Sequence, residues 1–108
     1  MALTEVKQIL EKFERDFDAN AAEGMDVVLQ YHISGEGGGD WNIKIKDGTC
    51  TIKEGVHDAP TVMFKMAGKT WLGLVNKTLN PMMAFTTGRI RIKGDMALAQ
   101  KIPALFQV

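Results

Sequence analysis

The sequence has a single cysteine, Cys50, and no apolar run that approaches the roughly 18–20 residues of a membrane-spanning helix. One thiol excludes a framework of internal disulfides and fits a reducing compartment. The N-terminal segment, residues 1–17, is charged and amphipathic, and it lacks the unbroken apolar core of a signal peptide. We therefore expect a cytoplasmic protein.

Residues that could carry catalysis are scarce. His32, His57 and Cys50 are the only candidates for a nucleophile, a general base or a metal ligand, and their spacing matches no zinc site. No serine stands in the strained turn of a hydrolase nucleophile. We expect no catalytic residue and no metal, so the chain is not predicted to be an enzyme by itself.

Two glycine-containing stretches are too incomplete to bind a nucleotide. Gly68-Lys69-Thr70 has the ending of a phosphate-binding loop, but the glycine that this motif needs five residues earlier is Met63. The glycine-rich stretch at residues 35–40 has Asp40 where a dinucleotide fingerprint has its last glycine. We therefore expect no cofactor.

The zero net charge hides a division along the chain. Residues 1–58 carry 12 of the 13 acidic and 6 of the 13 basic residues, a net charge of −6, and residues 59–108 carry a net charge of +6. A cationic second half around apolar residues favours an anionic partner such as a carboxylate, a phosphate or an anionic membrane. The alternative is that the two halves interleave in the fold and their fields cancel.

Hydrophobic periodicity predicts an α+β domain spanning residues 1–108. Thr4 is the predicted cap of the first helix, Asp47-Gly48 is a hairpin signal, and Pro103 is expected to end the last helix. The predicted helices cover residues 4–18, 71–79, 81–86 and 96–102, and the predicted strands cover residues 27–34, 41–46, 49–54, 61–66 and 89–93. This order indicates a five-stranded sheet with helices on one face and a lysine-rich face outward.

The cationic outer face does not indicate nucleic-acid binding. Single-stranded nucleic acids stack on exposed aromatic side chains among the cations. Trp41 shares the alternation of Ile43 and Ile45, so we expect it to point into the core. A charged face of this kind more often prevents association between sheets.

The second half also concentrates large apolar residues, and periodicity alone leaves two interpretations open. They form either a solid core or a site for an irregular apolar ligand. Methionine suits the second interpretation because it fits flexible shapes, and Met82, Met83 and Phe85 lie together in one short helix joined by glycine and proline.

The pattern of residues 79–106 resembles that of a known family, and this resemblance favours one of the two interpretations. They contain Asn80-Pro81, Ala84-Phe85, Thr87-Gly88, a lysine- and arginine-bearing strand at 89–93 that leads into Gly94-Asp95, and Leu105-Phe106 near the end. With the leading amphipathic helix and the alternating strand after Trp41, this pattern resembles the sterol carrier protein 2 domain family over nearly the whole chain.

The resemblance implies a five-stranded mixed sheet covered on one face by helices, with an apolar tunnel between them for fatty acids, fatty acyl-CoA or sterol-like lipids. Carried over by position, the lipid-binding residues would be Trp41, Phe64, Trp71, Leu72, Val75, Leu79, Met82, Met83, Phe85, Ile90, Ile92, Leu105 and Phe106. An anionic head group would meet cations near the mouth, for which Lys69, Lys77 and Lys101 are the candidates. The chain departs from the family pattern because it has no peroxisomal tail and ends soon after the last helix.

Two functions follow as expectations. The first is a non-catalytic intracellular lipid carrier, with a transient contact to an anionic membrane open as a further partner. The alternative is an accessory module that dimerises through the same groove or presents a lipid-soluble substrate to a partner enzyme.

Overall fold

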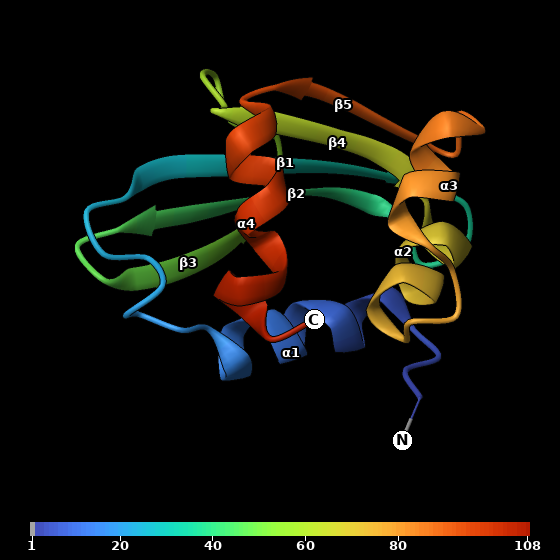
Figure 1. The fold of residues 1–108 in the computed structure, drawn as a ribbon, viewed down its shortest axis with the longest axis horizontal. Coiled ribbons are helices and arrows are strands. Elements are labelled where there is room, and N and C mark those ends of the chain that lie inside the picture. Colours follow the sequence, from blue (N-terminus) through green and yellow to red (C-terminus); the bar gives the residue numbers. More distant parts are fainter. Residues whose placement is uncertain (1) are drawn as a thin grey trace.

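The computed structural model describes residues 2–108 and has one β-sheet with helices packed against it (Figure 1). The elements are α1 (Val6–Asp16), β1 (Asp26–Ser34), β2 (Gly39–Lys46), β3 (Thr49–Glu54), β4 (Val62–Ala67), α2 (Gly68–Val75), α3 (Pro81–Thr86), β5 (Ile90–Gly94) and α4 (Met96–Phe106). Their order is the predicted one. The predicted α+β fold with a five-stranded mixed sheet is confirmed.

The sheet has the strand order β3-β2-β1-β4-β5. β1 runs parallel to β4, and the other neighbouring pairs are antiparallel. The register sets Tyr31 between Trp41 on one side and Phe64 on the other. Side chains alternate along each strand, so matched positions of adjacent strands place apolar side chains on one inner face. The helices cover this face: α1 packs on β3, α2 on β4, and α4 on β4 and β5.

A tight turn joins β2 to β3, as the Asp47-Gly48 dipeptide predicts. Asp47 and Gly48 have φ angles of 53° and 73°. Two central residues with positive φ form the kind of turn whose twist matches the twist of the flanking strands. The resulting register sets Ile43 opposite Ile52, both on the inner face.

The connection from β3 to β4, residues 55–61, crosses the outer face of the sheet and covers Gln30. Gln30 is 0% exposed. Its Nε2 donates to the carbonyl oxygens of Trp41 (3.2 Å) and Gly55 (3.1 Å), and its Oε1 accepts from the backbone amide of His57 (2.8 Å). The sequence predicts a polar, lysine-rich outer face. This covered part differs because the strand order makes the connection pass over β2 and β1.

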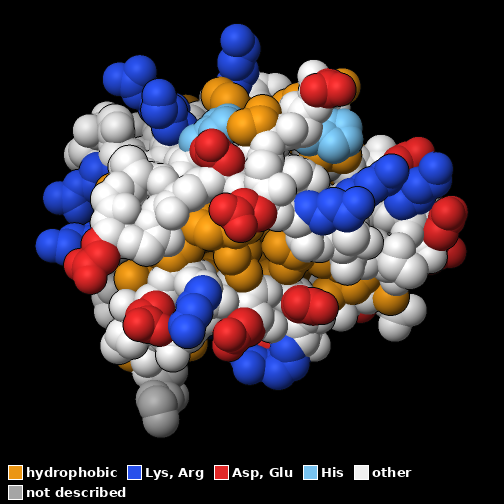
Figure 2. Space-filling model, turned by 180° about the vertical axis from the view of Figure 1, so that it is seen from behind, with side chains coloured by type: hydrophobic (Ala, Val, Ile, Leu, Met, Phe, Trp, Pro, Cys, Tyr) orange, Lys and Arg blue, Asp and Glu red, His pale blue; other side chains and the backbone are white. Residues whose placement is uncertain are grey.

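Acidic and basic residues share the side of the molecule seen from behind (Figure 2). Lys and Arg side chains stand beside Asp and Glu side chains, and hydrophobic side chains form a band across the middle of this view. The acidic half of the sequence supplies β1, β2 and β3 to the same sheet to which the basic half supplies β4 and β5. On this side, acidic and basic side chains are therefore mixed rather than separated into two patches.

The prediction that Pro103 ends the last helix is wrong, because α4 continues to Phe106. Proline lacks the N–H that would bond the carbonyl of Ala99, and in a helix interior it costs about 3 kcal/mol. Leu105 and Phe106 are both fully buried, and each large apolar side chain removed from water contributes about 1.5–3 kcal/mol. Burial of the last turn therefore offsets the missing hydrogen bond. The helix ends at Gln107, which has a φ of 59°.

Three of the four helices, α1, α3 and α4, begin at polar cap residues. The cap of α1 is Glu5 rather than the predicted Thr4, because the Gln8 side chain accepts hydrogen bonds from both of their backbone amides (3.0 and 2.8 Å). Asn80 caps α3 and Asp95 caps α4. No helix within residues 2–108 combines the length and the hydropathy that crossing a membrane requires.

Candidate functional site

A cavity of about 520 Å³ lies between the inner face of the sheet and the helices. Its floor comes from the strands, its walls from the helices, and its rim from the connection between α2 and α3 and from the end of the chain. The lining residues are Phe13, Tyr31, Phe64, Met66, Trp71, Leu74, Val75, Lys77, Thr78, Leu79, Asn80, Pro81, Ile90, Ile92, Ala99, Ile102, Pro103 and Val108. Several rim residues are exposed to solvent, so the cavity opens to the outside there.

An aromatic cluster forms the deep end of the cavity. The ring of Tyr31 lies between the rings of Phe64 and Trp71, with centroid distances of 4.8 and 4.6 Å and interplanar angles of 17° and 16°. Phe13 from α1 meets Tyr31 edge-on at 6.3 Å. Four elements, α1, β1, β4 and α2, thus contribute rings to one cluster.

The rim is formed where α2 gives way to α3. Lys77 follows α2 with a φ of 62°, and the side chain of Asn80 accepts hydrogen bonds from the first amides of α3. Asn76 ties this connection to the start of the chain, because its side chain exchanges two hydrogen bonds of 2.8 Å with the backbone of Leu3. The rim is therefore anchored at a point far from it in the sequence.

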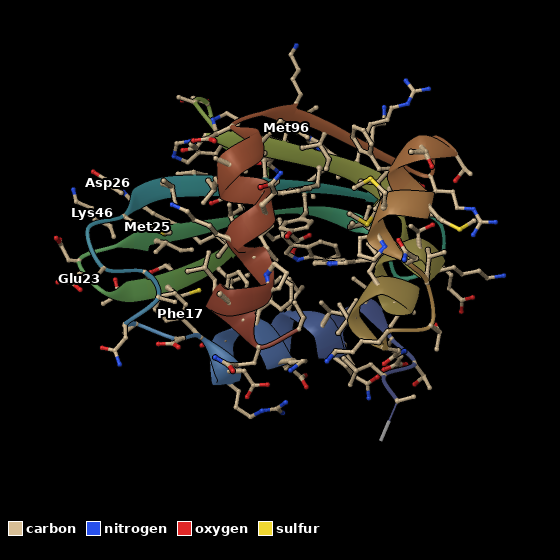
Figure 3. All side chains as sticks on the ribbon, in the orientation of Figure 1. Phe17, Glu23, Met25, Asp26, Lys46 and Met96 are labelled. Carbon is tan, nitrogen blue, oxygen red and sulfur yellow. The ribbon has the colours of Figure 1, made fainter. Side chains whose placement is uncertain are left out.

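The far end of the sheet has a different character (Figure 3). Glu23, Asp26 and Lys46 lie there, on the opposite side of the molecule from α2 and α3. Asp26 and Lys46 are register partners across β1 and β2. The charged end and the apolar opening are thus at opposite ends of the sheet.

The candidate catalytic residues are not brought together. The Nδ1 of His32 lies 2.7 Å from a carboxylate oxygen of Asp40, and His57 lies on the outer connection, where its backbone amide bonds Gln30. Cys50 is half-buried on β3. None of them lines the cavity. Within residues 2–108, no group of three or more His, Cys, Asp or Glu side chains is placed to hold a metal ion.

Six of the thirteen residues nominated as lipid-binding line the cavity: Phe64, Trp71, Val75, Leu79, Ile90 and Ile92. They lie at the alternate strand positions that face the helices, or on the inward side of α2 and of the connection that follows it. The other seven, Trp41, Leu72, Met82, Met83, Phe85, Leu105 and Phe106, are not part of the lining. Contact of any of the thirteen with lipid stays a prediction.

Five of the seven fall outside for two physical reasons. Leu105 and Phe106 are packed solidly inside the core. Met82, Met83 and Phe85 are 69%, 61% and 43% exposed on the outer side of α3. Their helix is anchored instead by Ala84, which is buried. α3 is too short for its hydrophobic periodicity to show which of its sides faces the sheet.

Of the three candidate head-group cations, Lys77 lines the cavity at its rim. Lys69, near the start of α2, and Lys101, on α4, are exposed and do not line it. Within residues 2–108 Lys77 forms no ion pair. The structure thus separates one of the three cations from the other two.

Some lining residues were not predicted. Phe13, Tyr31 and Met66 lie on faces that the periodicity already assigns to the inside, so this signal could have nominated them. Ala99, Ile102, Pro103 and Val108, from α4 and the residues after it, also line the cavity. Ala99 and Ile102 lie in the predicted helix, whereas the continuation of α4 past Pro103 was not predicted.

The amino-acid sequence that forms this sheet, these helices and the cavity matches a known protein family. The model of the SCP-2 sterol transfer family matches residues 6–107. The chain belongs to the SCP-2 sterol transfer family. This confirms the resemblance to the sterol carrier protein 2 domain family on which the sequence analysis rests.

Similar proteins include both free-standing SCP-2 domains and parts of enzymes. The chain is 39% identical to Hydroxysteroid dehydrogenase-like protein 2 of Bos taurus over 82 residues, 74% of this chain and 19% of that protein. A solution structure of palmitated SCP2L2 from Aedes aegypti has a TM-score of 0.77 and 25% identity, and the match covers 97% of this chain and 96% of that chain. The stereoselective inverting sec-alkylsulfatase Pisa1 from Pseudomonas sp. shares the fold, with a TM-score of 0.77, 19% identity and coverage of 87% and 15%. This chain thus spans about a fifth of the length of the curated relative.

Proposed function

We propose that this SCP-2 domain, residues 1–108, is a non-catalytic cytoplasmic lipid carrier that holds the apolar part of a fatty acid, a fatty acyl-CoA or a sterol-like lipid in its cavity. The observation that carries the proposal is the cavity of about 520 Å³, lined mostly by apolar side chains and open at one rim. Its volume falls in the range of roughly 300–1,000 Å³ that is typical of small-molecule sites. Each methylene group buried there would contribute about 0.8 kcal/mol.

The head group of the lipid would stay at the rim. An ionised carboxylate or phosphate is costly to bury without a partner, so it remains near water while the chain enters. Lys77 is the cation at the rim, and it supports an anionic head group at that point. Lys69 and Lys101 would act only through the longer-range field.

The exposed residues of α3 support a transient contact with an anionic membrane. Met82, Met83 and Phe85 leave apolar surface in water close to the rim residues Asn80 and Pro81. Apolar side chains beside cations insert at the boundary between lipid head groups and chains. A lipid could then pass between bilayer and cavity without crossing open water.

The test is a titration of delipidated protein with octadecanoic acid and with its CoA thioester. Trp71 lines the cavity and Trp41 does not, so the variant Trp41→Phe leaves one reporter inside the site. We expect a saturable change in tryptophan emission in both proteins, with a melting temperature that rises with ligand concentration.

The variant Trp71→Phe is the matched control for the reporter. It should lose the emission change and keep the rise in melting temperature. If neither the emission nor the melting temperature of the unmodified protein responds to either ligand, the carrier proposal is overturned.

A second candidate is a module that presents a lipid-soluble substrate to an enzyme or forms a homodimer. The observation that favours it is that the curated relative is much longer than the matched stretch, which covers 19% of it. Sedimentation across a range of protein concentrations tests the dimer. A single monomer at all concentrations, with lipid bound, leaves the carrier as the function of this chain.

A further inference from the structure

Two polar side chains are buried next to each other in β1, and only one of them has partners. Gln30 points to the outer face, where both ends of its amide are hydrogen-bonded. Tyr31 points to the inner face and is 2% exposed, yet its hydroxyl forms no hydrogen bond with any residue in 2–108. This contrast within one strand marks the Tyr31 hydroxyl as a group without a structural partner.

The hydroxyl of Tyr31 faces the cavity. Every side-chain nitrogen and oxygen that is fully sealed within the described part of the chain has a hydrogen-bond partner. The Tyr31 hydroxyl has no such partner, so it is not fully sealed. Tyr31 is one of the residues that line the cavity, and the hydroxyl is therefore accessible from there. The hydroxyl has no competing hydrogen-bond partner among residues 2–108, so a ligand oxygen that enters the cavity can bond it.

The position of this hydroxyl is set before any ligand arrives. Phe64 and Trp71 stack on the two sides of the Tyr31 ring, and Phe13 meets its edge. The ring cannot turn away without displacing these neighbours. A hydroxyl fixed in this way favours a ligand whose own polar group lies at the matching depth in the cavity.

The chemistry of the site favours a neutral partner over a charged one. Burial raises the pKa of Tyr31 above its usual range, so the phenol stays protonated and can both donate and accept. The surrounding rings are apolar, and an ionised group would be left without a counter-ion there. Among residues 2–108, Lys77 at the rim is the only cation that lines the cavity.

We propose that the Tyr31 hydroxyl binds a neutral oxygen carried by the apolar part of the ligand, a hydroxyl or a ketone or ester carbonyl, and so selects oxygenated lipids over plain hydrocarbon chains of the same length. This proposal rests on the carrier function proposed above. It adds that the cavity recognises a polar atom deep inside, apart from the head group at the rim. The class of ligand is a long-chain or ring lipid with one uncharged oxygen in its interior part.

The experiment compares octadecanoic acid with a series of octadecanoic acids that carry one hydroxyl at successive chain positions. Binding is measured for the unmodified protein and for Tyr31→Phe, which removes only the hydroxyl. We expect at least one position to bind more tightly than octadecanoic acid, and Tyr31→Phe to lose about threefold to tenfold in affinity for that acid alone. The lipid-free Tyr31→Phe variant should melt no lower than the unmodified protein, because no hydrogen bond is lost.

The variant Ile92→Val is the matched control, because it shortens an apolar lining residue that has no polar atom. It should change the affinity for every acid in the series by a similar factor. If Tyr31→Phe also does so, or if no hydroxylated acid is preferred while octadecanoic acid still binds, the role of Tyr31 is overturned and the carrier function stands. If neither the acids nor the CoA thioester of octadecanoic acid binds the unmodified protein, both proposals fall.

Discussion

The ring of Phe106 stacks on the ring of Phe13 with a centroid distance of 4.2 Å and an interplanar angle of 5°. This contact joins the last helix to the first. Phe13 lines the cavity and Phe106 does not, so Phe106 supports the cavity wall from behind. The backbone reinforces the same joint, because the amide of Asp18 donates to the carbonyl of Leu105 at 2.8 Å.

Replacement of Phe106 with alanine should lower the free energy of unfolding by about 3–5 kcal/mol, the usual cost of removing a buried aromatic ring. Urea denaturation followed by far-UV circular dichroism measures this change. Met82→Ala is the control, and it should stay within about 0.5 kcal/mol because Met82 is exposed. A loss below about 1 kcal/mol for Phe106→Ala would show that the stacked pair does not hold the helices together.

Gln30→Ala should destabilise the fold without touching the cavity. The change leaves the carbonyl of Gly55 and the amide of His57 without the Gln30 partner, and a buried unpaired group costs roughly 1–3 kcal/mol. We expect a loss above about 2 kcal/mol, faster hydrogen exchange at the His57 amide, and unchanged lipid affinity in the folded protein.

Asn42→Ala is the matched control for Gln30, because its side chain bonds the same carbonyl of Gly55 at 3.2 Å. The carbonyl keeps its bond to Gln30 in that variant, so the loss should be smaller. Equal losses in the two variants would contradict the role given to Gln30 in fastening the outer connection.

Lys77→Gln should weaken binding of octadecanoic acid by about twofold to fivefold at low salt, the range expected for one exposed ion pair. The methyl ester, which has no charge, should bind as before. Lys69→Gln and Lys101→Gln remove the same charge from positions off the lining, and they should have little effect. Fluorescence titrations at low and high ionic strength measure this, since added salt should remove the difference. Equal effects of the three variants would mean that only net charge matters.

Met83→Glu should slow lipid transfer from anionic vesicles and leave the affinity for soluble octadecanoic acid unchanged. Met83 is exposed and does not line the cavity, so a new negative charge opposes the membrane and not the ligand. Val56→Glu is the control, because Val56 is equally exposed on the outer connection between β3 and β4. A loss of soluble-lipid binding in Met83→Glu would show instead that α3 closes over the ligand.

Cys50 should react slowly with thiol reagents at neutral pH. Its burial, with a smaller effect from the nearby Glu14 carboxylate, raises the pKa of the Cys50 thiol to about 11. The thiolate is the reactive form, so the rate should keep rising with pH up to about 11 rather than levelling near the ordinary value of about 8.5. The guanidinium-unfolded protein provides the comparison. A folded protein that levels off near the ordinary value would contradict this environment for Cys50.

The local part of the fold could be predicted from the sequence because it depends on neighbouring residues. Alternation after Trp41 and the Asp47-Gly48 turn predicted β2, β3 and their hairpin. The predicted helices at 81–86 and 96–102 begin where α3 and α4 begin. The same alternation placed Phe64 on the inner face. Such features follow from backbone geometry over a few residues.

The cavity was decided by packing between distant segments. Tyr31 meets Trp71 across forty positions of the sequence, and the exposed side of α3, which carries Met83, depends on how that helix docks beside β5. Pro103 reads locally as the end of a helix, but the burial of Phe106 against α1 carries α4 past it. The sequence by itself determined the order of the elements and the inward faces of the strands. Only the tertiary structure decided which inward residues touch one another and which border open space, because that depends on how the helices dock against the sheet.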